Sequence, residues 1–376
     1  MASISGPRMP TRSRRSPTPP TPAPSDDEPV HWKSSGRLAF ATVLTGGGIA
    51  LVLASLAGVA LGSVTVPVAE VWATLRFHIL GVGSAPGDLY AMIVWQLRVP
   101  RVLAAVLVGA ALSVAGAVLQ GMVRNPLADP FVLGVSSGAS LAAVAVMSSV
   151  SALWIRNLGV PVAAFAGAIA ALLLVLLFAE HQGEFTGPRI VLAGVAVGQV
   201  AAAATSLIQL RSEPAEIRGI LFWMMGSVAG AELGALTLPA VLAVSCLAWL
   251  LVQGRGLNAL SMGDDDAVAL GIDVNRLRIQ LIVIVAILTG LAVSVAGGVG
   301  FVGLIIPHIA RFAAGSDYRR LLPVSAVLGA AFLVLIDLAA RAIDPPNEYP
   351  LTIFTAALGG PFFLWLLKRS RSGGAV

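Results

Sequence analysis

The ionisable residues of this chain show no arrangement that could catalyse a reaction. The phosphate-binding loop of an ATPase places a lysine behind a glycine-rich turn, but neither Lys33 nor Lys368 follows a Gly-x-x-x-x-Gly pattern. The four histidines are scattered, and none pairs with another ligand at helical spacing. We therefore expect no nucleotide site, no metal site and no cofactor, and we predict that the chain is not an enzyme.

Asp337 and Arg341 are charged residues in an otherwise apolar run. They stand four positions apart, so they share one face of a helix. An ionisable group in lipid needs a partner and often marks a transport path. Two interpretations stay open, a structural ion pair and a direct contact of Asp337 with a substrate.

Arg98 and Arg101 flank Pro100 at the beginning of another apolar run. Proline is common in the first turn of a helix. Two cations one turn apart either anchor the helix by snorkelling to the membrane surface or form a docking patch for an acidic partner. In the docking interpretation, Arg341 belongs to the same patch on the outer face.

A polar turn closes the run that begins at Arg98, and it reads QGMVRNPLADP from Gln120 to Pro130. Asparagine and two prolines predict a helix end followed by a tight turn. Gln120 itself is an intramembrane polar residue. The segment is either a capped turn or a cytoplasmic gate, in which Asn125 and Leu127 stand where a pore along the second span opens inward.

The only long polar segment between two apolar runs is 254–278. Three aspartates begin a short helix, where carboxylates complement the positive helix end. A small apolar face follows, and a glycine ends the helix with a left-handed cap. The segment is either a solvated connector or a coupling loop, at 254–276, that an external ATPase grips. The residues expected to couple are Asp264, Asp265, Asp266, Ala267, Leu270 and Gly271.

Composition places the chain in a membrane. It is 57% hydrophobic and 11% charged, whereas soluble proteins carry about 25% charged residues. Apolar runs of about 20 residues recur, which is the length that crosses about 30 Å of hydrocarbon as a helix. The single cysteine, Cys246, reads as a packing residue. The net charge of +5 comes from basic residues at span ends and does not indicate nucleic-acid binding.

We predict an all-α, polytopic membrane protein with ten transmembrane helices. A Pro-rich disordered tail covers 1–36, the ten-span membrane domain covers 37–370, and a short tail covers 371–376. Most lysines and arginines fall in loops that lie on the same side of the membrane as the N-terminus. Because basic loops stay in the cytoplasm, this side is cytoplasmic and contains both termini and the coupling loop. The segment 217–229 is too short to cross and is expected to be an interfacial half-helix. The predicted spans are 38–62, 99–122, 131–150, 157–179, 189–209, 234–253, 277–299, 301–314, 321–343 and 350–368.

Two segments repeat one another. Residues 109–118 read GAALSVAGAV and residues 290–299 read GLAVSVAGGV. They fall in the second and seventh spans, which run in opposite directions. This predicts an inverted repeat with the transport path between the halves, although small-residue runs can also look alike by chance.

Together these motifs resemble the FecCD-type permeases of ABC importers for iron-siderophores, haem and cobalamin. The resemblance covers about 38–368. It is carried by RVPR at 98–101, RNPLADP at 124–130, LGVSSGA at 133–139, WMMG at 223–226, AVALG at 267–271, GFVGLIIPH at 300–308 and GPF at 360–362.

The resemblance implies a ten-span, cobalamin-importer-permease-like fold in a bacterial inner membrane. It implies a homodimer, or a heterodimer with a paralogue, with the pore between the subunits and helices near the fifth span lining it. It also implies cytoplasmic ABC ATPase subunits at the loop after span six and an extracytoplasmic solute-binding protein docking at Arg98, Arg101 and Arg341, with membrane lipid around the helices. The expected cargo is a ferric siderophore. The alternatives are haem or cobalamin, and a different class, an ion-coupled secondary transporter.

Overall fold

The computed structural model describes residues 32–62, 64–83, 89–148, 159–182 and 184–372. These residues are almost entirely helical, and the one strand-like pairing among them is an isolated bridge between His181 and Glu184. A chain in lipid must satisfy its backbone hydrogen bonds internally, and helices do so within one segment. The predicted all-α membrane class is confirmed.

Seven helical segments are long and apolar enough to cross a membrane. They are α1 (Trp32–Ala60), α3 to α4 (Leu89–Val123), α7 (Val160–Ala179), α8 (Gly187–Arg211), α10 (Leu233–Val252), α13 (Val274–Ala296) and α15 (Tyr318–Ala342).

Three further apolar helices are shorter in their apolar part. They are α5 (Val135–Met147), α14 (Val302–Ala314) and α16 (Leu351–Ser372). Each of the ten helices coincides with a predicted span. That all ten cross the bilayer stays a prediction. Of the predicted tails, 1–31 and 373–376 lie outside the described residues. The described parts of both tails are helical, because α1 begins at Trp32 and α16 ends at Ser372.

Short helices join the long ones. The half-helix predicted at 217–229 is α9, which begins earlier because Glu213 and Glu216 form a capping box around its first turn. The other short elements are α2 (Val68–Leu80), α3 (Leu89–Met92), the π-helix η1 (Ile93–Arg98), the 3₁₀ turn η2 (Pro130–Leu133), α9 (Pro214–Met224), α11 (Gly254–Met262) and α12 (Asp264–Ala269).

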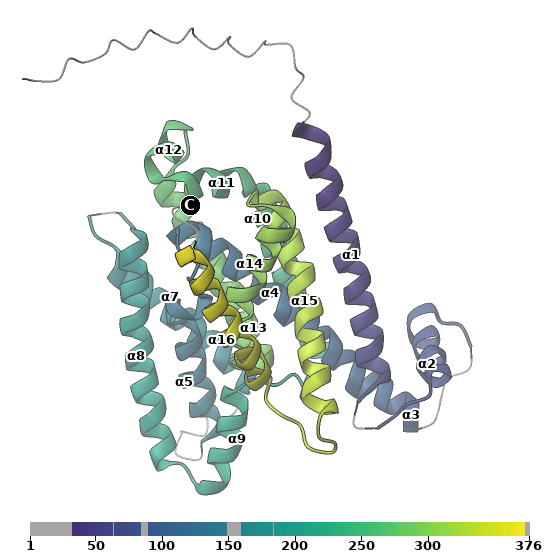
Figure 1. The fold of residues 1–376 in the computed structure, drawn as a ribbon. Helices are drawn as coiled ribbons and strands as arrows, with labels where there is room; N and C mark the ends of the chain where they lie inside the picture. Colours follow the sequence, from purple (N-terminus) through teal and green to yellow (C-terminus); the bar gives the residue numbers. More distant parts are fainter. Residues whose placement is uncertain (1–31, 63, 84–88, 149–158, 183, 373–376) are drawn as a thin grey trace, which may run out of the picture.

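The bundle has two distinguishable ends (Figure 1). Helix α1 begins, and α16 ends, toward the end where α11 and α12 lie. Helices α2, α3 and α9 lie toward the opposite end. We call these the α12 end and the α2 end. Both ends of the described helical region therefore share a side with the predicted coupling loop.

Helix α4 (Val99–Val123) is the centre of the bundle, and α13, α14 and α15 surround it. Small residues let it approach these helices closely. A Cβ on Gly116 would collide with the carbonyl oxygen of Gly303 in α14, and a Cβ on Gly109 would collide with that of Gly329 in α15. Backbone therefore meets backbone at both contacts.

The two segments of the proposed repeat do run in opposite directions. Arg124, at the C-terminal end of α4, and Arg278, near the N-terminal end of α13, both pair with Asp264. The repeat also relates their neighbours, because Gly109 of α4 packs against α15, the ninth predicted span, and Gly290 of α13 lies next to Ala168 of α7, the fourth. These contacts fit the predicted inverted repeat.

In one copy of the chain most of α4 packs against other helices, and a pore along the second span stays a prediction. Most of α4, α13 and α15 is buried, and the small-residue faces of α4 are filled by neighbouring backbone. Most of α1, α8 and α10 is instead unburied. Small residues signal close approach, and here what approaches is another helix.

We predict that Gly116→Ala lowers the thermal stability of the purified protein, because its methyl group must push α4 away from α14. Overpacking of this kind costs about 1–3 kcal/mol. The matched control is Gly46→Ala in α1, where an added Cβ meets nothing within 4 Å. Thermal unfolding in detergent checks both variants, and equal midpoints for the two would contradict the close contact.

Candidate functional site

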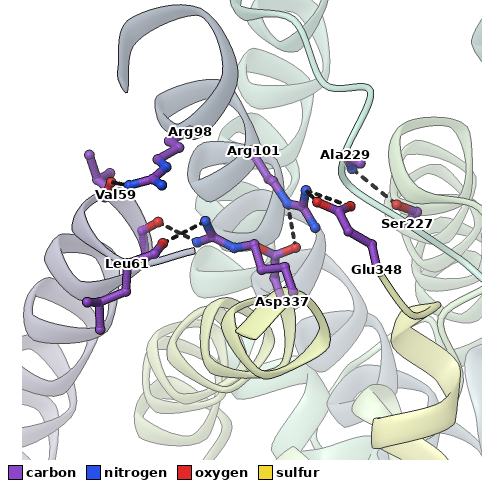
Figure 2. A network of polar contacts seen from close by, with 10 residues as sticks. Val59, Leu61, Arg98, Arg101, Ser227, Ala229, Asp337 and Glu348 are labelled. Carbon is purple, nitrogen blue, oxygen red and sulfur yellow. Dashed lines mark hydrogen bonds and ion pairs between the residues drawn. The ribbon is translucent and has the colours of Figure 1, made fainter. Parts of the chain in front are cut away.

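Two arginines close the C-terminal end of α1. Arg98 donates to the carbonyl oxygens of Val59 at 2.9 Å and Ala60 at 2.7 Å, and Arg341 donates to that of Leu61 at 2.8 Å (Figure 2). The last carbonyls of a helix have no intrahelical donor and carry partial negative charge. The two guanidinium groups supply both the missing donors and the opposite charge.

Arg101 joins the same network from the next turn (Figure 2). Its Nε lies 2.8 Å from Asp337 Oδ1, and its Nη1 lies 2.9 Å and 3.0 Å from the two oxygens of Glu348. Arg341 Nε lies 3.2 Å from Asp337 Oδ2, an ion-pair contact without hydrogen-bond geometry. Asp337 is thus held between two arginines from α4 and α15.

These contacts revise the two interpretations of the arginines. Arg98, Arg101 and Arg341 are 5%, 9% and 4% exposed, so they neither snorkel to a surface nor protrude as a patch. They line a cavity of about 310 Å³ at the α2 end, together with the partly exposed Glu348 and with Ala229 from the segment after α9. A docking partner would have to place an acidic group into this cavity.

Asp337 is 1% exposed and does not line that cavity. Of the two interpretations left open, the ion pair with Arg341 is present in the structure, extended by Arg101. The sequence spacing indicated the first partner. Arg101 is 236 positions away, and no local pattern could indicate it.

Gln120 has a structural task that sequence reasoning missed. Pro307 interrupts α14 and has no N–H, which leaves the carbonyl of Gly303, four residues earlier, without its helical donor. Gln120 Nε2 donates to that oxygen at 3.2 Å, and Gln120 Oε1 accepts from Arg311. The sequence features that could have indicated this contact are a lone glutamine in one span and a proline in another.

The turn after α4 has the predicted caps. Arg124 adopts a left-handed conformation with φ of 53°, and the N–H of Asn125 bonds to the Gln120 carbonyl at 3.1 Å. Asn125 Oδ1 accepts from the N–H of Leu127 at 2.9 Å. Both Asn125 and Leu127 are exposed at the α12 end. Their role as a gate stays a prediction.

The predicted coupling loop folds into α11 and α12. Gly271 has φ of 78°, its N–H bonds to the Val268 carbonyl at 2.9 Å, and the N–H of Ile272 bonds to the Ala267 carbonyl at 3.0 Å. These two bonds are the Schellman motif, which fixes the end of the helix as predicted. Ala267 is buried, and the large apolar residues exposed at this helix end are Val268 and Leu270.

The aspartates of α12 differ in their surroundings. Asp265 and Asp266 are exposed, whereas Asp264 accepts from Arg278 Nη2 at 2.9 Å and 3.0 Å. A cavity of about 630 Å³ lies beside this loop, lined among others by Arg255, Leu270 and Arg276. The loop therefore offers a mixed polar and apolar surface next to a hollow.

Helix α11 is tied to the beginning of α15. Asn258 Nδ2 donates to Asp317 Oδ1 at 2.8 Å, and Asn258 Oδ1 accepts from the N–H of Tyr318 at 2.9 Å. Burial acts to raise the pKa of Asp317, but hydrogen bonds from Asn258 and the Arg319 N–H outweigh it and hold that pKa below its ordinary value. Sequence reasoning missed this contact, which joins positions about 60 residues apart.

We predict that Asp337→Asn strongly destabilises the protein, because it removes the carboxylate shared by two buried guanidinium groups. Breaking a buried pair in this way costs about 3–5 kcal/mol. The matched control is Glu348→Gln, which removes a charge from the same Arg101 at a side chain that is 33% exposed. Thermal unfolding in detergent should rank Asp337→Asn well below Glu348→Gln, and the reverse order would contradict the network.

Known transport proteins resemble the chain over most of its length. The FecCD transport family matches residues 50–369. The vitamin B12 import system permease protein BtuC of Vibrio cholerae serotype O1 is 42% identical over 290 residues, covering 76% of this chain and 86% of its own length. The iron(3+)-hydroxamate import system permease protein FhuB of Bacillus subtilis is 38% identical over 350 residues, covering 92% of this chain and 88% of its own length.

A solved structure supports the same relationship. It is an inward-facing conformation of a metal-chelate type ABC transporter, and it superimposes with a TM-score of 0.74 at 29% identity, covering 88% of this chain and 99% of that one. Fold, motif order and relatives agree: the chain belongs to the FecCD transport family, the membrane permeases of ABC importers.

Proposed function

We propose that this chain is the membrane-spanning subunit of an ATP-driven importer for a chelated metal compound. One observation carries the proposal: a short helix with an exposed face, α12, lies beside a cavity at one end of a helical bundle whose sequence holds no nucleotide-binding motif. Such a chain needs an external motor, and α12 is the element that a motor could grip. The α12 end is accordingly cytoplasmic, with both termini on that side of a bacterial inner membrane.

The ATPase contact is built from the surface of α12 and its neighbours. Leu270 is 66% exposed and lines the adjacent cavity, which also contains Arg255 and Arg276. An apolar side chain in the middle with charges around it is the usual composition of a protein interface. Asp265 and Asp266 add carboxylates on the exposed side.

The transport path lies between two copies of the chain, or between this chain and a paralogue. Helix α4 is mostly buried by its neighbours, apart from a face that lines a cavity of about 480 Å³ beside α10, whereas α8 exposes a series of apolar side chains, namely Leu192, Val200, Leu207 and Leu210. Pairing two such faces supplies the path that one copy does not enclose. Asn125 and Leu127, exposed in the turn after α4, are then placed to close it at the cytoplasmic end.

The binding protein docks at the α2 end. The cavity there contains Arg98, Arg101 and Arg341 beside Glu348, so an acidic side chain of the partner would compete with Glu348 for Arg101. Glu348 is the partly exposed member of the network and the one that can yield. Docking would then loosen a contact that joins α4 to the segment before α16.

Three cargo classes have support from relatives. A ferric siderophore is favoured by the ferric hydroxamate relative, whose similarity extends over 92% of this chain. Cobalamin is favoured by the relative with 42% identity. Haem is favoured by a hemin transport permease that is 36% identical over 86% of this chain. The apolar helices offer little to discriminate among them, which leaves cargo selection mainly to the binding protein.

We predict that deleting the gene abolishes uptake of one labelled chelate while uptake of the others persists. Cells are supplied in parallel with ferric hydroxamate, cyanocobalamin and haem, and the intact gene on a plasmid is the control. Loss confined to ferric hydroxamate supports the siderophore assignment, and loss confined to cobalamin or haem replaces it. Unchanged uptake of all three contradicts the proposed function.

We also predict that Leu270→Asp abolishes transport without removing the protein from the membrane, because it places a charge in the apolar part of the ATPase contact. The control is Leu80→Asp, an equally exposed leucine at the α2 end. Co-purification of the ATPase subunits with each variant is the measurement. Normal recovery of the ATPase with Leu270→Asp would remove α12 from the interface.

A further inference from the structure

Asp264 is the first residue of α12, and its partly exposed carboxylate pairs with two arginines of the bundle. It accepts from Arg278 of α13 at 2.9 Å and 3.0 Å, and it lies 3.6 Å from Arg124 at the end of α4. The side chain of Arg278 is only 5% exposed. One carboxylate thus connects the predicted coupling helix to two helices of the bundle.

Each of these arginines leads to a turn at the α12 end. Arg124 is the left-handed residue that ends α4, directly before Asn125. Arg278 also donates through Nη1 to the Phe185 carbonyl, at 2.6 Å, in the turn between α7 and α8. The N–H of Phe185 donates to Asn275 Oδ1 at 3.1 Å, which ties this turn to α13 a second time.

We propose that Asp264 transmits displacement of α12 to both turns, to the α4–α5 turn through Arg124 and to the α7–α8 turn through Arg278. This role rests on the proposed function, in which an ATPase moves α12. Asp264 is a positioning residue that acts by holding the two arginines.

The two contacts of Asp264 differ in strength, so displacement of α12 affects the two turns differently. We call Asp264 and its two arginines the relay. Arg278 is buried, hydrogen-bonded and close to Asp264, so it stays attached when α12 moves. Arg124 is 48% exposed and its contact is longer than a hydrogen bond. Half-exposed pairs of this kind are weak and break readily. Displacement of α12 therefore acts strongly on α13 and the α7–α8 turn and more weakly on the α4–α5 turn.

The neighbouring aspartates do not share this role. Asp265 and Asp266 are exposed and form no ion pair with any described residue. The Schellman bonds at Gly271 make α12 a rigid unit, so that a push on its exposed face moves Asp264 with it. Asp264 has this role because its position in α12 brings it next to the two arginines, and negative charge alone is not sufficient.

The test uses the complete transporter with its ATPase and binding protein in proteoliposomes, with ferric hydroxamate and cobalamin as cargo probes. The readouts are cargo transported per ATP hydrolysed and recovery of the ATPase. Arg124→Gln removes the weak link, and Arg124→Lys keeps its charge. Glu180→Gln, an exposed residue of the α7–α8 connection with no ion pair among the described residues, is the matched control for charge removal. Asp264→Asn alone and combined with Arg124→Gln completes a double-mutant cycle.

We expect Arg124→Gln to lower cargo per ATP about two- to fivefold, the range of a half-exposed ion pair, with ATPase recovery and thermal stability unchanged. Arg124→Lys and Glu180→Gln should retain the wild-type ratio. The double variant should couple no worse than Asp264→Asn, because Arg124 acts through Asp264.

Three results would overturn the relay while the intact transporter works: an unchanged ratio in Arg124→Gln, an equal loss in Glu180→Gln, or independent losses that multiply in the double variant. Because Asp264→Asn leaves Arg278 buried without its carboxylate and can impair folding, the single Arg124 variants decide the question if it does. Failure of the wild-type complex to transport either probe with ATP would instead overturn the proposed function.

Discussion

The structure depends on backbone contact between α4 and its neighbours. Gly109 and Gly116 bring α4 so close to α15 and α14 that no side chain could stand between them. In lipid the hydrophobic effect does not press helices together, so close packing of small residues must hold them. This fixes α4 as an axis, and it leaves the outer helices α1, α8 and α10 to meet lipid or a second copy.

Close packing of helices in lipid leaves backbone groups that only side chains can satisfy. Arg98 and Arg341 supply donors to the end of α1, and Gln120 supplies one to the carbonyl that Pro307 leaves free. Each device joins helices that are distant in sequence. The α2 end is held by a buried network of charges, whereas the α12 end is held by partly exposed pairs. The mobile part of the transporter is therefore expected at the α12 end, where the ATPase contact is proposed.

The sequence predicted the helices well because an apolar run of about 20 residues has few other solutions in a membrane. The Gly271 cap and the α9 half-helix were also local features and were predictable. The features that the sequence did not predict are tertiary contacts. A stripe of small residues does not say what will approach it, so the backbone contacts of α4 with α14 and α15 could not be predicted. The partners of Arg98 and Arg101, the task of Gln120 and the link between Asn258 and Asp317 each join distant positions. Gate, docking and coupling roles remain predictions that the structure positions without testing.

The most direct measurement of the central claim, that α12 couples an external ATPase to import, is accumulation of a labelled chelate by proteoliposomes containing this chain with its ATPase and binding protein. The account predicts accumulation against a gradient only when ATP is hydrolysed, with none when a non-hydrolysable analogue replaces ATP. Accumulation driven by a proton or sodium gradient in the absence of ATP would contradict it and would make the chain an ion-coupled transporter.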